Sequence, residues 1–74
     1  MQKKTFIDNM ESRGYGIRTT VTGNIVATNG DTTIEWLRTD HERIYVATPK
    51  IKALIDPKIA DAEALQLMDY LARP

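Results

Sequence analysis

The chain lacks cysteine, has a single histidine and a single serine, and contains no long apolar run. Without cysteine it can form neither disulfides nor thiolate metal sites, and its composition fits a reducing compartment. No window approaches the roughly 18 consecutive apolar residues that a membrane-spanning helix requires. We therefore predict a cytoplasmic protein that does not enter a membrane.

The scarcity of nucleophiles and bases argues against catalysis. His41 lies in Asp40-His41-Glu42, but neighbouring side chains in a turn diverge, so this segment is typical of a solvent-exposed turn rather than a metal site. Ser12 has no nucleophile elbow around it. Gly14-x-Gly16 precedes an expected strand, whereas a phosphate-binding loop precedes a helix. The sequence thus predicts no enzymatic activity, no catalytic residue, no cofactor and no metal.

Surplus charge of one sign is also missing, because ten basic side chains balance ten acidic ones. A zero net charge argues against a general electrostatic attraction to nucleic acid, which depends on surplus lysine and arginine. The 74 residues fit one small globular domain, residues 1–74, and we take the chain as a complete small protein. A domain of this length buries only roughly 60% of its surface on folding.

Helix signals occur at both ends of the chain. Thr5 followed by Asp8, with a glycine stop at Gly14, predicts a helix over residues 4–13. Thr48-Pro49 looks like an N-cap followed by a first-turn proline, and predicts a short helix carrying Ile51, Leu54 and Ile55. Asp61 is expected to cap the longer helix 62–72, whose inner stripe comprises Ala64, Leu65, Met68, Leu71 and Ala72.

Between these ends, β-branched residues alternate with polar ones and predict strands. Asn29-Gly30 is a strong hairpin signal; as a two-residue loop it places Thr28 opposite Asp31 and Ile25 opposite Ile34. In the preceding hairpin, a three-residue loop over residues 22–24, with Asn24 in the left-handed region, pairs Val21 with Ile25 and keeps one face apolar.

A fourth strand over residues 43–47 can point its apolar side chains into the core only if the preceding loop has an odd length, three or five residues. The predicted fold is a two-layer α+β domain. It has an N-terminal helix, a four-stranded antiparallel meander, and one short and one longer C-terminal helix packed on one sheet face. The expected inner face comprises Ile17, Val21, Ile25, Ala27, Ile34, Trp36, Ile44 and Val46.

The residues that alternate with this set form the outer face, and they carry the best functional signal. Apolar and aromatic side chains flanked by arginines are typical of partner-binding surfaces. We therefore predict a non-enzymatic protein-interaction module that uses the outer sheet face, or an edge strand at residues 16–22 or 43–47, to bind a protein partner or a second copy in a homodimer. The partner-binding candidates are Arg18, Val26, Leu37, Arg43 and Tyr45.

Nucleic-acid binding is the alternative. Residues 43–58 hold four basic side chains against one acidic side chain, which gives the chain a locally basic segment despite its zero net charge. The contacts on this alternative would come from Arg18, Arg43, Lys50 and Lys52.

Overall fold

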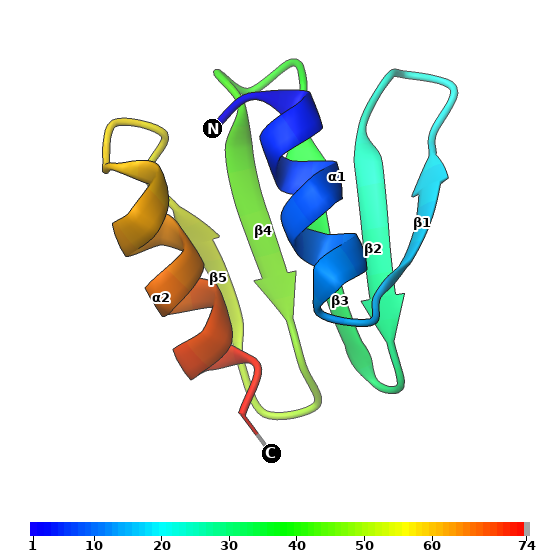
Figure 1. Ribbon diagram of the computed structural model, residues 1–74, viewed down its shortest axis with the longest axis vertical. Helices are drawn as coiled ribbons and strands as arrows, with labels where there is room; N and C mark the ends of the chain where they lie inside the picture. The colour runs from blue at the N-terminus through cyan, green and yellow to red at the C-terminus, as the bar shows by residue number, and fades with distance from the viewer. Residues whose placement is uncertain (74) are drawn as a thin grey trace.

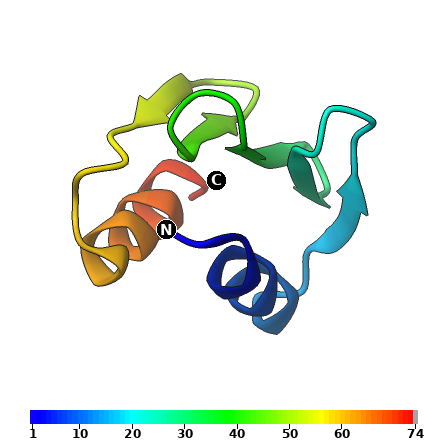
Figure 2. The same cartoon turned by 90° about the horizontal axis from the view of Figure 1, so that it is seen from above.

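The computed structural model describes residues 1–73, which form two helices and a five-stranded antiparallel sheet (Figure 1). The strands follow one another as a meander, in the order β1-β2-β3-β4-β5. Figure 2 shows the sheet curving around the two helices, which lie on the same face. The predicted α+β class is confirmed, and the predicted meander is one strand short. The elements are α1 (Lys3–Ser12), β1 (Gly16–Thr19), β2 (Ile25–Asn29), β3 (Thr32–Leu37), β4 (Arg43–Ala47), β5 (Lys52–Ile55) and α2 (Asp61–Leu71).

Helix α1 matches its prediction to within a residue at each end. It starts without a side-chain cap, and the side chains of Lys4 and Asp8 pair across one turn at 3.0 Å. At its end, Gly14 takes a positive φ of 84° and donates its N–H to the carbonyl of Glu11, while Tyr15 N–H reaches the carbonyl of Met10. This pair of bonds is the Schellman motif, which satisfies helix carbonyls that would otherwise lack donors.

Helix α2 also lies where the sequence predicts the longer helix. Asp61 is its first residue rather than its cap, because the capping position is Ala60 and no side chain caps the helix. Asp61 and Glu63 place negative charge in the first turn, where the helix dipole favours it. Ala64 and Met68 are fully buried, and the rest of the predicted inner stripe is partly buried. Neither helix within residues 1–73 is long and apolar enough to cross a membrane.

The predicted short helix at residues 49–55 is wrong, because this segment forms strand β5, which pairs with β4. The prediction that residues 43–47 form an edge of the sheet is therefore wrong as well, because β4 lies between β3 and β5. The Thr48 hydroxyl accepts the N–H groups of Lys50 and Ile51, at 3.2 and 3.0 Å, so it organises a hairpin turn instead of a helix start. Tertiary pairing with β4 outweighs the local helix propensity of lysine, alanine and leucine in this segment.

Both predicted hairpin registers are displaced by two residues. Strands β2 and β3 pair Asn29 with Thr32, so the loop is Gly30-Asp31, and Ile25 faces Trp36 rather than Ile34. Only Gly30 in this loop has a positive φ, 60°, which matches a type II′ turn with glycine first.

The β1–β2 hairpin is wider than predicted, since Thr19 pairs with Ile25 and residues 20–24 form the loop. Gly23, rather than Asn24, takes the positive φ there. Val21, expected on the inner face, lies in the loop and is fully exposed. A register shift of two residues keeps every other side chain on its predicted face.

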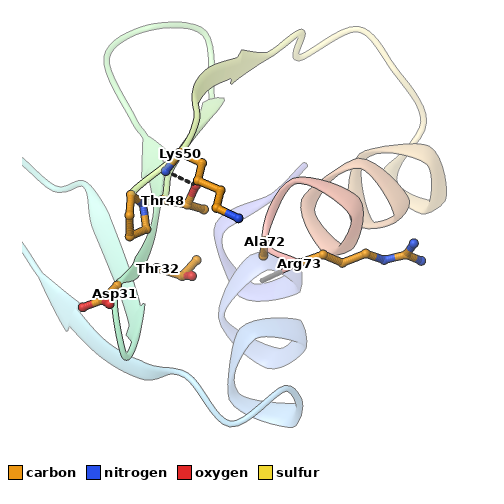
Figure 3. A pocket seen from close by; sticks show the side chains of 7 residues that line it. Asp31, Thr32, Thr48, Lys50, Ala72 and Arg73 are labelled. Atoms are coloured by element: carbon orange, nitrogen blue, oxygen red, sulfur yellow. Dashed lines mark hydrogen bonds between the residues drawn. The ribbon is translucent and has the colours of Figure 1, made fainter.

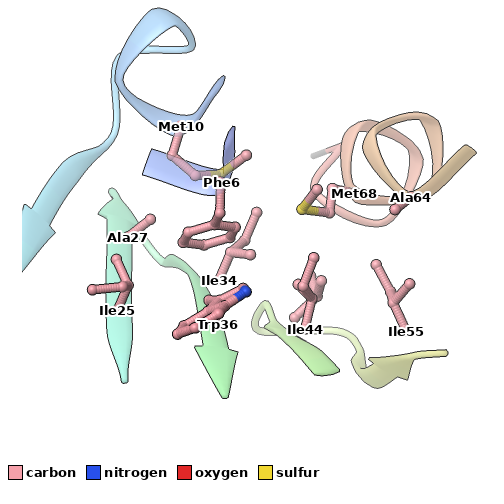
Figure 4. Packing of buried hydrophobic residues seen from close by; sticks show 11 residues of the cluster. Phe6, Met10, Ile25, Ala27, Ile34, Trp36, Ile44, Ile55, Ala64 and Met68 are labelled. Atoms are coloured by element: carbon pink, nitrogen blue, oxygen red, sulfur yellow. The ribbon is translucent and has the colours of Figure 1, made fainter. Parts of the chain in front are cut away.

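The core lies between the inner face of the sheet and the two helices (Figure 4). The β3–β4 loop, residues 38–42, has five residues, one of the two predicted lengths, so Ile44 and Val46 point inward. Trp36 is buried as predicted and donates its indole N–H to the carbonyl of Met1 at 2.9 Å. The buried cluster comprises Phe6, Met10, Ile25, Ala27, Ile34, Trp36, Ile44, Val46, Ile55, Ala64 and Met68.

Candidate functional site

Within residues 1–73, the outer face of the sheet carries no helix, since α1 and α2 both cover the opposite face (Figure 2). Cross-strand pairing aligns the outer side chains in rows that run across the strands. Two rows cross all five strands, and the pair of Leu37 and Arg43 forms a shorter row on the other side of the central one. The central row is Arg18, Val26, Glu35, Tyr45 and Leu54.

The accessible apolar part of this face lies toward β4 and β5. Tyr45 on β4 pairs directly with Leu54 on β5, and Leu37 on β3 pairs with Arg43, two residues before Tyr45 on β4. Leu54 is 54% exposed, and Leu37 and Tyr45 are partly exposed. Leu54 was missed by the sequence reasoning because it was assigned to a helix; the alternating pattern of Lys52, Ala53, Leu54 and Ile55 is the signal that a strand reading would have used.

Val26 behaves differently from the other predicted patch residues, because only 4% of it is exposed although it lies on the outer face. The Asn24 side chain lies beside it, donating to Glu35 Oε2 at 2.9 Å and accepting the Arg38 N–H at 3.0 Å. These two bonds tie the β1–β2 loop to β3 and to the start of the β3–β4 loop. Val26 therefore contributes to folding and offers little surface to a partner.

Basic side chains surround the apolar residues of the outer face. Arg18 is exposed beside Val26, and Arg43 is partly exposed with its Nη1 3.6 Å from Asp40 Oδ2. Lys52 joins them through the neighbouring row, in which it pairs with Ala47. Glu35 carries a negative charge in the central row and is held by its bond to Asn24.

Lys50 lies apart from this face, in the turn between β4 and β5. It borders a cleft of about 360 Å³ where two hairpin turns approach the end of α2 (Figure 3). Asp31 and Arg73 also border the cleft, but Figure 3 shows these two side chains extending in opposite directions. The cleft therefore lacks convergent charged groups of the kind that orient a small ligand.

A charged pair joins the two helices beneath the sheet. Arg13 Nε and Nη2 donate to the two carboxylate oxygens of Asp69 at 2.8 and 3.1 Å. This hydrogen-bonded guanidinium lowers the pKa of Asp69, and the carboxylate raises the pKa of Arg13. Burial raises the pKa of the nearby Tyr15 phenol, and the Asp69 charge adds to that shift. The pair fixes the two helices to each other rather than forming a reactive site.

The segment Asp40-His41-Glu42 forms part of the β3–β4 loop, where His41 and Glu42 are exposed and both take a positive φ. Within residues 1–73, no group of three or more histidine, aspartate or glutamate side chains is arranged to hold a metal ion.

Comparisons of the chain with protein-family models, with curated proteins and with solved structures find no match.

Proposed function

We propose that the protein is a non-enzymatic interaction module of the cytoplasm, and that it binds a partner protein through the outer face of its sheet. The observation that carries this proposal is the uncovered central row, in which Tyr45 and Leu54 stand side by side. Leu37 extends the apolar area, Arg43 borders it, and Arg18 lies in the same row on β1 beyond Val26 and Glu35. An apolar centre with an arginine-bearing rim is the composition that protein interfaces favour.

The test replaces the apolar centre while leaving the fold intact. The Tyr45→Ser/Leu54→Ser variant should lose the partners that tagged wild-type protein captures from a lysate. A matched variant on the exposed side of α2, Gln66→Ser, should keep them. Loss of capture by both variants, or by neither, would contradict a binding site on the outer face.

Self-association through the same face is the homodimeric form of this proposal. Sedimentation of the purified wild-type protein should then reveal a dimer that the Tyr45→Ser/Leu54→Ser variant converts to a monomer. A monomeric wild-type protein across the accessible concentration range would leave a foreign protein as the partner.

Nucleic acid is the second candidate, favoured by Arg18, Arg43 and Lys52 lying on one face with an aromatic side chain between them. Amide NMR titration with short duplex DNA and RNA at low salt tests it. Binding should weaken steeply with salt, and Arg43→Gln/Lys52→Gln should reduce that salt dependence. Lys50→Gln serves as the basic control outside the face.

A further inference from the structure

The exposed apolar side chains of this protein gather around one edge of the sheet. Residues 1–73 contain five large apolar side chains that are exposed, and four of them belong to β5, the turn before it, or α2. The fifth, Val21, lies in the loop next to the opposite edge. The four are Ile51, Leu54, Leu67 and Tyr70.

The orientation of α2 directs one of these side chains toward the open side of β5. Asp69 faces α1, because it pairs with Arg13, and the buried Met68 faces the sheet. Leu67 precedes Met68 by one residue and Asp69 by two, which places it beside the buried side of α2 and away from α1. Tyr70 follows Met68 by two residues, so it points away from the sheet, beside Arg73. Figures 1 and 2 both place α2 over the free edge of β5 and extending past it, with α1 on its other side. The inner side of this edge therefore has an apolar surface, provided by Leu67 where α2 extends past β5, and we call this surface the ledge.

The backbone of β5 offers unused hydrogen-bonding groups along this edge. Thr48 N–H donates to the carbonyl of Ile51 at 2.8 Å, so Thr48 and Ile51 are a hydrogen-bonded pair of the β4–β5 ladder. In an antiparallel pair, alternate residues bond to the neighbouring strand. Ala53 and Ile55 therefore bond to β4, while Lys52 and Leu54 point their N–H and C=O groups outward. Such an edge is a template for a further strand.

The charge near this edge indicates the chemistry of the strand that it would accept. Lys50, Lys52 and Lys58 are exposed within or next to β5, against Asp56 in the same segment and Glu63 one turn before Leu67 on α2. An incoming strand with acidic side chains on the outer face would complement Lys52, and apolar side chains on its other face would contact Leu67.

A second copy of this chain would bring a second helix to the edge. Antiparallel pairing of two β5 strands keeps the helices of both copies on the same face of the joined sheet. Because α2 extends past the edge, both α2 helices would then project over the junction between the copies (Figures 1 and 2). A lone extended segment brings no helix to the junction and is therefore the simpler occupant.

We propose that β5 accepts an extended segment of another protein as a sixth strand, and that this segment alternates apolar with acidic residues. Strand addition forms main-chain bonds at Lys52 and Leu54, and the ledge of α2 provides side-chain contacts. This site shares only Leu54 with the apolar centre of the outer face, so it can be tested separately from the function proposed above.

The probe is a capped peptide of about ten residues that alternates valine and glutamate, a length sufficient for one added strand. In the free protein, the amides of Lys52 and Leu54 should exchange with solvent faster than those of Ala53 and Ile55. Saturation with the peptide should slow exchange at Lys52 and Leu54 by about tenfold or more. Amide shifts should be centred on β5 and Leu67. The same peptide with lysine in place of glutamate should bind far more weakly.

Two variants of Lys52 separate the backbone contribution from the charge. Lys52→Ala should weaken binding several-fold, whereas Lys52→Pro should abolish it, because proline removes an outward N–H while leaving the bonds to β4 in place. Circular dichroism checks that both variants fold. If Lys52→Pro unfolds the protein, Lys52 N–H bonds to β4 and the proposed edge is wrong.

Other results would overturn the proposal. It fails if the valine–glutamate peptide leaves exchange at Lys52 and Leu54 unchanged. It also fails if the peptide shifts only the amides of Leu37, Arg43 and Tyr45, because the peptide would then bind the outer face instead. Equal binding of the glutamate and lysine peptides would contradict the proposed charge preference. Failure at β5 with intact partner capture through Tyr45 and Leu54 would leave the outer-face function standing.

Discussion

The two faces of the sheet are built from the same five strands and differ in what covers them. On the inner face, two helices bury Ile34, Trp36 and Val46 almost completely. On the outer face neither helix of the described residues is present, and Tyr45 and Leu37 remain partly exposed. Val26 is the exception, since it is as buried as the core although it lies on the uncovered side. The comparison indicates that stability depends on the inner face, while the outer face, apart from Val26, is available for binding.

The largest effect should come from truncating an inner side chain. Ile34→Ala should destabilise the protein by about 2–5 kcal/mol, because it removes buried methyl groups and leaves a cavity beneath α1 and α2. The neighbouring outer substitution Thr33→Ala is the matched control and should cost less than about 0.5 kcal/mol. Urea unfolding measures both. If the two variants lose similar amounts of unfolding free energy, the inner face does not contribute more to stability than the outer face.

A smaller loss of stability is expected when Val26, the buried residue of the outer face, is truncated. Val26→Ala should cost about 1–2 kcal/mol, since its two lost methyl groups are buried despite the uncovered face. Thr28→Ala, two residues along the same strand and exposed, should have almost no effect. The same urea experiment tests the pair, and a neutral Val26→Ala would mean that its burial adds nothing to stability.

The ion pair between Arg13 and Asp69 should contribute less to the free energy of unfolding than Val26 does. The side chains of Arg13 and Asp69 are 28% and 54% exposed, so Asp69→Asn should cost only about 0.5 kcal/mol near neutral pH. The pKa of Asp69 is lowered in the folded state, so this contribution is fully present above the unfolded-state pKa of about 3.9. It is lost as the pH falls through the lower folded-state pKa. Wild-type protein and Asp69→Asn should therefore converge in stability at about pH 2, and a constant difference would contradict the ion pair.

The smallest effect on stability is expected on the accessible part of the outer face. Tyr45→Ser and Leu54→Ser should each shift the free energy of unfolding by no more than about 0.5 kcal/mol. Thermal unfolding followed by circular dichroism is sufficient to measure this. A loss comparable to that of Ile34→Ala would place these side chains in the core and invalidate the outer-face binding site.

The sequence was a good guide to which face each side chain occupies and a poor guide to register. Alternation placed Ile44 and Val46 inward correctly, and both hairpin errors were shifts by two residues, which preserve the faces. Local turn signals could not choose between Asn29-Gly30 and Gly30-Asp31, because both contain the glycine that supplies a positive φ. The predicted binding patch was incomplete because it lacked Leu54.

Leu54 lies in a segment whose residues and Thr48-Pro49 start suit a helix locally, and only pairing with β4 makes it a strand. Tertiary pairing of this kind leaves little trace in a single sequence. The arginines and Tyr45 were placed correctly on one face because strand alternation alone determines that placement.

The meander also bears on how the chain folds. Each strand pairs with the strand next to it in the sequence, so the sheet can form by successive hairpins that close only short loops. The bond between Arg13 and Asp69, by contrast, joins residues 56 positions apart. We expect a rapid folding phase for the hairpins, with α2 docking last and detaching first. That order would expose the inner side of β4 and β5 in partly unfolded molecules, where an unpaired edge invites aggregation.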